Sequence, residues 1–385
     1  MEYQVQIIES LQRTATVSAT SENEAVRLAR RLYEKEEIVL DSNDFVGVDF
    51  SLSTDFPSSQ TSENFHLHTN EDYSQRDPSS SKIRNLGRVP LFYKSPNRDF
   101  TLLQGDCTQL LPQFSFSFDM IFADPPYFLS NGGISVQSGK VVCVDKGDWD
   151  KGGSPEHIDH FNEEWLRCCR DHLKENGTIW VSGTYHNIFS VANKLTQLGF
   201  KILNVITWAK TNPPPNISCR YFTYSTEFVI WARKQQKVPH YYNYALMKQL
   251  NGDKQMTDVW RLPAIARWEK SQGKHPTQKP LSLLARIILA STKPGAWVLD
   301  PFAGSSTTGI AANLLGRRYL GIEREEEFLR LSRARREEIE SFAMAADYRH
   351  RIKDIAALEQ MGHPTEWLGI EGLASEESTA IDLPF

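Results

Sequence analysis

The strongest constraint on the fold is an alternation of strand and helix patterns that begins near residue 90. Apolar runs with strand character recur at residues 99–105, 118–123, 177–183, 200–210, 225–234, 295–303 and 317–325. Segments with helical spacing separate most of them, at 107–114, 160–176, 186–199, 280–292, 307–316 and 326–342. Continuous apolar strands joined by helices are typical of a parallel sheet covered on both faces. The sequence therefore predicts an α/β, doubly wound, mostly parallel sheet.

Composition divides the rest of the chain. Residues 1–50 alternate as strands around one amphipathic segment and predict a small ββαβ domain. Residues 51–89 are rich in Ser, Thr, Asn, Asp and Pro, and their few aliphatic side chains cannot offset the entropy cost of ordering, so they predict a flexible linker. The α/β pattern fills residues 90–342, and residues 343–385 are expected to form an acidic tail.

The composition excludes several classes of protein. Hydrophobic residues make up 40% of the chain and charged residues 24%, which is ordinary for a soluble globular protein, and no apolar run reaches the roughly 18 residues of a membrane span. We expect no secretory signal and a cytoplasmic location. The five cysteines form no CxxC pair and no Cys/His metal spacing, so reduced thiols are expected and no metal is predicted.

Charge is distributed unevenly along the chain. The net charge is −5, yet residues 201–286 hold 14 Lys and Arg against 4 Asp and Glu, a local excess of ten positive charges. Such a segment can bind phosphates on an acidic protein. A solvated surface is the alternative. If the partner is a nucleic acid, the candidates for contact are Lys210, Arg220, Arg233, Lys234, Arg261 and Arg267, interleaved with Tyr221, Tyr224, Trp260 and Trp268.

One candidate site follows the strand at residues 118–123. The tetrapeptide Asp124-Pro125-Pro126-Tyr127 falls at the carboxyl end of that strand, where doubly wound sheets bind ligands. The Asp124 carboxylate and the Pro125 carbonyl can accept the two N–H groups of an exocyclic amine, and Tyr127 can stack on the heterocycle that bears it. An ordinary turn with a capping Asp124 is the alternative.

A second candidate site is "VLDPFAGSSTTG" at residues 298–309. Gly304 permits close approach of the backbone, and the following N–H groups begin a helix that favours an anion. Glu323 ends the next strand, where an acid normally holds ribose hydroxyls. The segment matches neither GxGxxG nor the Walker pattern, which disfavours a nucleotide-dependent oxidoreductase. A nucleoside that carries a carboxylate, such as S-adenosylmethionine, suits this pair of features.

Three segments carry a family resemblance. "DPPY", "DPFAGSSTTG" and "KHPTQKP" (residues 274–280) resemble motif IV, motif I and the flank of motif X of the amino-methylating DNA methyltransferases, in the permuted β-class order. The match covers about residues 90–342 and is most similar to the subgroup of HinfI and the second DpnII methylase. It implies a Rossmann-like, circularly permuted fold with a DNA-recognition segment at about 235–273. Residues 1–50 resemble the small DpnD/PcfM-like family.

The resemblance also implies roles for individual residues. Asp124, Pro125, Pro126 and Tyr127 would bind and activate the target amine. Glu323 would hold the ribose, Asp106 would approach the adenine, and residues 275–279 would hold the methionine end. Ser306 departs from the family's FxGxG form. The full cofactor-binding set is Asp106, His275, Thr277, Lys279, Asp300, Phe302, Gly304, Ser305, Ser306, Thr307 and Glu323.

The implied reaction is direct methyl transfer from S-adenosylmethionine to an amine of a base flipped out of DNA. Asp in the tetrapeptide favours adenine N6 over cytosine N4, because Ser usually replaces it in cytosine enzymes. The alternatives are a cytosine-N4 methyltransferase and an inactive regulator that binds S-adenosylmethionine or DNA. The resemblance suggests GATC or GANTC as the target. A homodimer is a family expectation, and a cognate restriction endonuclease is an open question.

Overall fold

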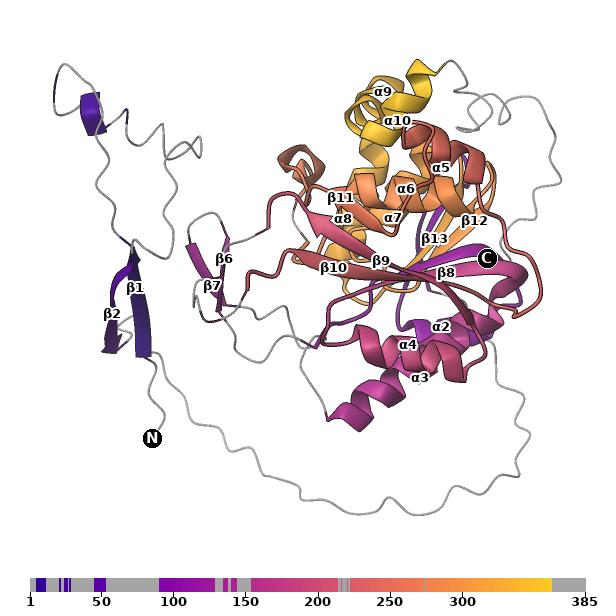
Figure 1. Ribbon diagram of the computed structural model, residues 1–385, viewed down its shortest axis with the longest axis horizontal. Coiled ribbons are helices and arrows are strands. Elements are labelled where there is room, and N and C mark those ends of the chain that lie inside the picture. The colour runs from indigo at the N-terminus through magenta and orange to yellow at the C-terminus, as the bar shows by residue number, and fades with distance from the viewer. Residues whose placement is uncertain are drawn as a thin grey trace, which may run out of the picture. The chain divides into compact units, whose positions relative to one another are not determined.

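The computed structural model describes residues 5–11, 21, 24–26, 28, 45–52, 90–128, 134–137, 140–143, 154–213, 216, 220, 222–273 and 275–361 (Figure 1). The chain forms two units, and the smaller one comprises Met1–Gly87, Ser135–Val142 and Pro215–Phe222. In that unit β1 (Val5–Leu11) pairs antiparallel with β2 (Phe45–Leu52). Much of the predicted ββαβ domain and the linker at residues 53–89 lie outside the described residues.

The larger unit contains a nine-stranded sheet. A separate two-stranded sheet, which pairs β6 (Ile134–Gln137) with β7 (Lys140–Cys143), belongs largely to the smaller unit. Strands β8, β5, β12, β13 and β4 run parallel to one another, and β11 runs parallel to β9. β10 runs antiparallel to both β8 and β9, and β3 runs antiparallel to β4. The predicted mostly parallel α/β sheet is confirmed. In spatial order the strands are β11 (Val259–Leu262), β9 (Lys201–Lys210), β10 (Thr226–Arg233), β8 (Leu173–Gly183), β5 (Phe118–Ala123), β12 (Trp297–Asp300), β13 (Arg318–Glu323), β4 (Phe100–Gln104) and β3 (Leu91–Lys94).

Helices cover both faces of the sheet (Figure 1). One face carries α2 (Cys107–Leu110), α3 (Pro155–Asp171) and α4 (Ile188–Gln197), and the other carries α5 (Tyr244–Leu250), α6 (Leu281–Ser291), α7 (Thr307–Leu314) and α8 (Glu326–Glu338). The residues of β5 divide between the two cores: Met120 and Phe122 pack with α6 and α7, whereas Ile121 and Ala123 pack with α3 and α4. Alternate side chains of a strand point to opposite faces, which is why a strand buried on both sides is apolar throughout.

The two motif-bearing strands are neighbours in the sheet although they are far apart in the chain. β5 pairs parallel with β12, with Met120 opposite Val298 and Ile121 opposite Leu299. Asp124 directly follows β5, and Asp300 is the last residue of β12. Because both strands end at the same edge of the sheet, the two predicted sites face one common region.

Two predicted boundaries are wrong. Residues 173–176 were expected to end a helix, but they belong to β8, because α3 begins earlier, at the Ser154 cap and Pro155, and is complete by Asp171. The predicted acidic tail contains α9 (Phe342–Arg351) and α10 (Lys353–Gln360). Tyr348 of α9, Ile352 between the two helices, and Ile355 and Leu358 of α10 are buried in the core. The α/β domain therefore extends beyond residue 342, and residues 362–385 lie outside the described part of the chain.

Among the described residues, no helix is both long enough and apolar enough to cross a membrane.

Candidate active site

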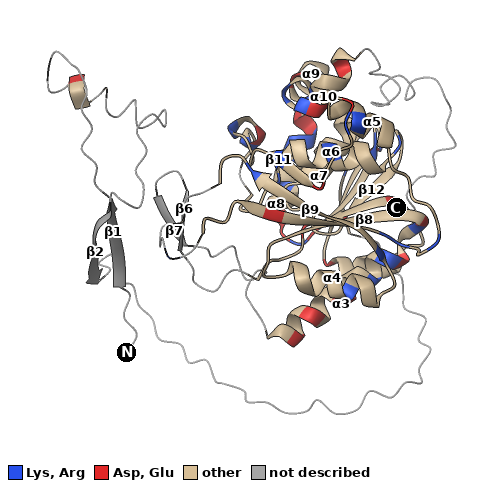
Figure 2. Ribbon diagram, in the orientation of Figure 1, with Lys and Arg blue, Asp and Glu red and all other residues tan. Residues whose placement is uncertain are grey.

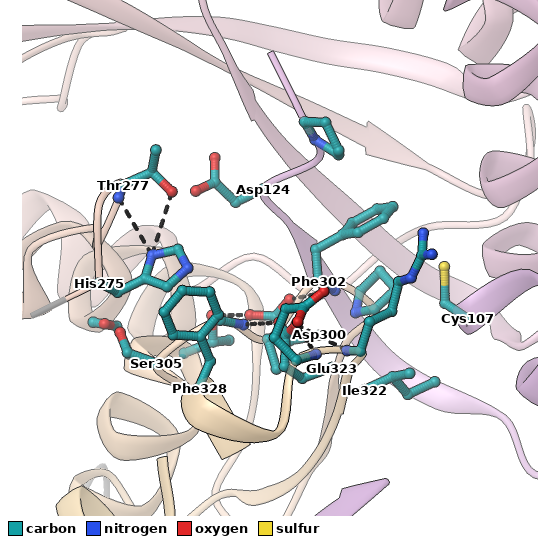
Figure 3. Close-up of a pocket in the computed structure, with 18 of the residues that line it drawn as sticks. Cys107, Asp124, His275, Thr277, Asp300, Phe302, Ser305, Ile322, Glu323 and Phe328 are labelled. Carbon is teal, nitrogen blue, oxygen red and sulfur yellow. Dashed lines mark hydrogen bonds between the residues drawn. The ribbon is translucent and has the colours of Figure 1, made fainter. Parts of the chain in front are cut away.

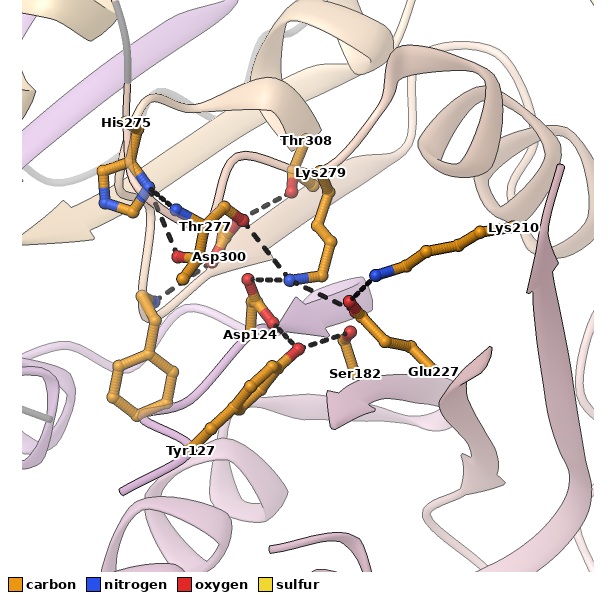
Figure 4. Close-up of polar contacts among 11 residues, drawn as sticks. Asp124, Tyr127, Ser182, Lys210, Glu227, His275, Thr277, Lys279, Asp300 and Thr308 are labelled. Atoms are coloured by element: carbon orange, nitrogen blue, oxygen red, sulfur yellow. Dashed lines mark hydrogen bonds and ion pairs between the residues drawn. The ribbon is translucent and has the colours of Figure 1, made fainter. Parts of the chain in front are cut away.

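The tetrapeptide at residues 124–127 is held in place by the neighbouring strand β8 and the start of α4 (Figure 4). The Tyr127 hydroxyl donates a hydrogen bond of 2.6 Å to Asp124 Oδ1 and lies 3.0 Å from Ser182 Oγ, at the end of β8. The Asn187 amide, at the cap of α4, donates to the carbonyl of Pro126 at 3.1 Å. Tyr127 is buried, and burial raises its pKa well above the ordinary value. The Asp124 carboxylate is thus fixed in orientation by a neutral phenol.

A second contact to Asp124 comes from Lys279, which the resemblance assigns to the methionine end of the cofactor. Lys279 Nζ lies 2.6 Å from Asp124 Oδ2 and 3.8 Å from Glu227 Oε2. Burial alone would lower the pKa of Lys279, but Asp124 and Glu227 outweigh it and hold that pKa above its ordinary value. Glu227 is in turn bound by Lys210 Nζ at 2.5 Å. The structure therefore places Lys279 between two carboxylates.

The second motif forms a tight loop between β12 and α7. Gly304 has φ of +49°, and its N–H donates to Glu323 Oε2 at 2.8 Å. A Cβ on Gly304 would lie 3.1 Å from Nε2 of His275, so only glycine fits here without displacing that ring. The other oxygen of Glu323 accepts the N–H groups of Arg324 and Glu325. Glu323 is consequently oriented by three backbone donors at the end of β13.

Side chains of helix α8 donate hydrogen bonds to the same loop. The sequence did not identify these residues. Ser332 Oγ donates to the Gly304 carbonyl at 2.9 Å. Arg335 Nη1 donates to the Ser305 carbonyl at 2.6 Å, to Ser305 Oγ at 3.1 Å and to Thr307 Oγ1 at 3.0 Å. Arg335 is 2% exposed, although it stands in the basic run "RARR" of a helix that looks solvated in sequence. Its spacing of three from Ser332 places both side chains on one helix face, which is the only signal that could have found them.

A pocket that opens to solvent joins the two motifs (Figure 3). Asp124 and Pro126 form one part of its wall, and the loop between β12 and α7 forms another. The sequence did not predict the aromatic residues Phe161 and Phe328 or the apolar Ile322, which also line it. The predicted cofactor residues in the wall are Asp106, His275, Thr277, Lys279, Asp300, Phe302, Gly304, Ser305, Thr307 and Glu323.

Three predicted site residues do not line this pocket. Pro125 and Tyr127 lie beside it as parts of the fixed tetrapeptide, and Ser306 is fully buried behind the loop. The direct cofactor contact predicted for Ser306 is therefore wrong. Ser306 has φ of +53°, the left-handed conformation that the family's glycine adopts easily, and its Oγ accepts a hydrogen bond from the Tyr319 hydroxyl at 3.2 Å. This bond accounts for a serine at a position that favours glycine.

The pocket fits S-adenosylmethionine. Glu323 presents an oriented carboxylate for ribose hydroxyls, and the N-terminus of α7 favours a carboxylate. Phe302, packed edge to face on Trp165 at 5.3 Å, offers an apolar wall for an adenine ring. Asp106 caps α2 through the Thr108 N–H at 2.8 Å and stands in the wall of the pocket.

Asp300 gives the site a pH-dependent stability. Burial raises the pKa of Asp300 to about 7, opposed by the Thr308 hydroxyl and the Phe302 N–H that donate to it. An unfolded chain loses this proton near pH 4, at about the ordinary Asp value. Between about pH 4 and pH 7 the folded state therefore binds more protons, so the free energy of unfolding falls as pH rises through this window. Each unit of pKa difference is worth about 1.4 kcal/mol.

We accordingly expect the melting temperature of the wild type to fall between pH 5 and pH 8, and to fall less in the Asp300→Asn variant. Differential scanning fluorimetry across this range measures both curves. Parallel curves for the two proteins would show that Asp300 does not titrate in the folded state as described.

Most predicted DNA-contact residues have structural partners instead. The Lys and Arg of residues 201–286 are dispersed over β9, β10, α5 and β11 (Figure 2). Lys210 binds Glu227, and Lys234 is buried with its Nζ donating to the Leu173 carbonyl at 2.7 Å. Trp260 is buried in the core. A contact with DNA by Lys234 or Trp260 is excluded by this burial.

Other members of the predicted set lie at the surface. Arg220, Arg261 and Arg267 are exposed, while Arg233 donates to the Gln236 carbonyl and Trp268 packs edge to face on Tyr348. Tyr224, just before β10, is exposed and stacks on Tyr185, just after β8, with ring centroids 5.2 Å apart. Tyr221 lies outside the described residues.

Comparisons with known proteins identify the family of the chain. Residues 118–334 match the family described as DNA methylase, and residues 3–48 match the DpnD/PcfM-like proteins. The chain is 55% identical over 273 residues to the type II methyltransferase M2.MboI of Moraxella bovis, a match that covers 70% of this chain and 100% of that one. It is 62% identical over 222 residues to the type II methyltransferase M2.DpnII of Streptococcus pneumoniae, covering 57% and 83%.

A solved structure shows the same fold. The PvuII DNA methyltransferase, described as cytosine-N4-specific, is 20% identical with a TM-score of 0.53, and the match covers 70% of this chain and 97% of that one. The predicted family, its subgroup and the identity of the N-terminal domain are confirmed. The chain belongs to the DNA methylase family and is a DNA methyltransferase.

Proposed function

We propose that this DNA methyltransferase transfers the methyl group of S-adenosylmethionine to N6 of adenine at a specific site in DNA. One observation carries the proposal: Asp124 lines the same pocket as Gly304 and Glu323. An amine held by Asp124 is therefore next to a donor held by the loop between β12 and α7. This juxtaposition is what direct transfer requires, because the reacting atoms must be brought to near contact and aligned.

The residues of the tetrapeptide have distinct parts in this reaction. Asp124 and the carbonyl of Pro125 accept the N–H groups of the amine, which orients its lone pair toward the pocket. The Tyr127 hydroxyl fixes Asp124, and the aromatic ring lies beside the position of the base. When bound, S-adenosylmethionine supplies an electrophilic sulfonium methyl group. The chain contributes alignment and hydrogen bonding, and no covalent intermediate with the protein is needed.

The identity of the base rests on Asp124. A carboxylate accepts hydrogen bonds only, and this suits an amine with two N–H groups. The family tendency of Asp for adenine and Ser for cytosine supports adenine. A base must leave the duplex to reach Asp124, and the exposed Tyr185 and Tyr224 offer stacking surfaces at the ends of adjacent strands.

The experiment that tests the proposal is analysis of DNA from cells that express the protein. Digestion to nucleosides and mass spectrometry identify the modified base, and sequencing of modified positions gives the target site. We expect N6-methyladenine within one short sequence, with GATC and GANTC as the candidates. N4-methylcytosine instead would overturn the choice of base, and unmodified DNA would favour an inactive regulator.

The biological setting is a further part of the proposal. The type II names of the relatives support a restriction-modification context, with a cognate restriction endonuclease. A homodimer is proposed from the family, and size-exclusion chromatography with light scattering tests it. A cytoplasmic location follows from the DNA substrate.

A further inference from the structure

We propose that Glu227 and Lys210 are positioning residues of methyl transfer: Glu227 draws Lys279 away from Asp124 when the target amine binds, and Lys210 acts through Glu227 rather than through DNA. The inference rests on the proposed function, since it concerns how the amine gains access to Asp124. It differs from the sequence prediction, which placed Lys210 among the DNA contacts. It also assigns a role to Glu227, which the sequence did not single out.

The four charged groups form an alternating row in the site (Figure 4). In order they are Lys210, Glu227, Lys279 and Asp124, with separations of 2.5, 3.8 and 2.6 Å. Their side chains are 18%, 14%, 7% and 15% exposed. Groups this buried interact more strongly than surface pairs do, and removal of one leaves its neighbour with an uncompensated charge. The row contains two cations and two anions, so it is neutral as a whole.

Both carboxylate oxygens of Asp124 already accept a hydrogen bond, which indicates why a second carboxylate is needed. Its Oδ1 accepts the Tyr127 hydroxyl, and its Oδ2 accepts the Lys279 ammonium. The incoming amine must share or replace one of these contacts. Glu227 Oε2 is 3.8 Å from the ammonium, so a shift of roughly 1 Å would bring Lys279 to hydrogen-bond distance from Glu227. Glu227 thus offers Lys279 a second acceptor that keeps its charge compensated.

The strands fix this arrangement in the fold. Antiparallel β10 brings Glu227 opposite Trp208 of β9, two residues before Lys210. Lys210 Nζ lies 5.1 Å from the centre of the Trp208 ring, and Trp208 is anchored by its indole N–H to the Leu262 carbonyl. The Lys210 ammonium is therefore directed along the sheet edge to Glu227. The burial of Lys210 and its ion pair with Glu227 account for a lysine at this position without a contact to a DNA phosphate.

A double-mutant cycle tests the inference, with Lys210→Met, Glu227→Gln and the two combined. If Lys210 acts through Glu227, Lys210→Met lowers kcat by about fivefold in the wild type and adds little to the loss in Glu227→Gln. Glu227→Gln itself is expected to lower kcat by about tenfold with the Kd for S-adenosylmethionine within about twofold of wild type. Lys210→Arg should restore most of the activity of Lys210→Met.

Salt dependence separates the two roles of Lys210. A residue that binds a phosphate contributes to the slope of log affinity for DNA against log salt, and its loss reduces that slope by about one. We expect Lys210→Met to leave this slope unchanged. Arg261→Met is the matched control, because Arg261 is an exposed residue of the adjacent strand β11. Its effect on kcat should be the same in the wild type and in the Glu227→Gln variant. A reduced slope for Lys210→Met, or equal kcat losses in both backgrounds, would overturn the inference.

Failure of the proposed function can be told apart from failure of this inference. If the modified base is cytosine, the same cycle can be measured with that base, and the coupling of Lys210 to Glu227 still decides the inference. A readout without substrate is the urea midpoint of unfolding, where Lys210→Met should cause a larger shift in the wild type than in Glu227→Gln. Equal shifts of the urea midpoint in the two backgrounds, together with an unchanged kcat for Glu227→Gln, would show that the four charged groups are not coupled.

Discussion

Replacing Asp124 with Asn is expected to lower kcat for methyl transfer by about 100-fold or more, with the Kd for S-adenosylmethionine within about twofold of wild type. The amide keeps the shape of the carboxylate but loses its charge, and its NH₂ group can only donate where the target amine needs an acceptor. The Tyr127 hydroxyl and Lys279 Nζ would also lose their ionic partner. Tritium transfer to DNA measures turnover, and calorimetry measures cofactor affinity.

Asp119→Asn is the matched control, because Asp119 lies on the same strand at its opposite end. Its oxygens accept from Lys174 Nζ and the Trp297 N–H, far along β5 from the pocket. We expect unchanged kcat for this variant and some loss of stability. If Asp124→Asn turns over at the wild-type rate while circular dichroism shows both variants folded, Asp124 does not activate the amine.

The position of the site was predictable because it follows from topology. A run such as "MIFA" before Asp124, or "WVL" before Asp300, marks the end of a buried strand in the sequence. Parallel strands in a doubly wound sheet deliver their carboxyl ends to one edge, whatever their order in the chain. The structure accordingly brings Asp124 and Gly304 to one pocket although the order of the motifs is permuted.

The partners of these residues could not be predicted in the same way. Glu227 reaches Lys279 only because β10 enters the sheet antiparallel beside β8, and a strand pattern does not state its direction. Local composition also misleads where charged side chains are buried. The excess of basic residues suggested phosphate contacts for Lys210 and Lys234, yet tertiary packing gives each a partner within the protein.

Local composition also failed to predict the two helices at the end of the domain. The short helices α9 and α10 each contain three charged residues, and several of their apolar residues are alanines, so the segment resembles a solvated tail. This segment is fixed to the domain by an ion pair between residues far apart in the chain. Arg286 of α6 binds Asp354 of α10 through two hydrogen bonds of 2.7 and 3.0 Å. Such a bidentate pair depends on the packing of α10 against α6 and has no local signature.

Replacing Arg335 with Met is expected to weaken binding of S-adenosylmethionine by about tenfold or more, which corresponds to about 1.4 kcal/mol. Arg335 does not line the pocket, but its three hydrogen bonds fix the positions of Ser305 and Thr307, which do. Without it, the Ser305 carbonyl is left buried without this donor, and the loop that orients Gly304 toward Glu323 loosens. Unfolding should become easier by about 2 kcal/mol for the same reason.

Arg333→Met is the control for this prediction, because Arg333 lies on the same helix but on its exposed face, where it pairs with Glu337. A surface pair of this kind contributes at most about 1 kcal/mol, so neither cofactor affinity nor stability should change much. Calorimetric titration of both variants with S-adenosylmethionine gives the comparison. Wild-type affinity in a folded Arg335→Met protein would mean that the backbone of the loop holds its shape without α8, and that Ser332 and the bond between Gly304 and Glu323 suffice to form the cofactor site.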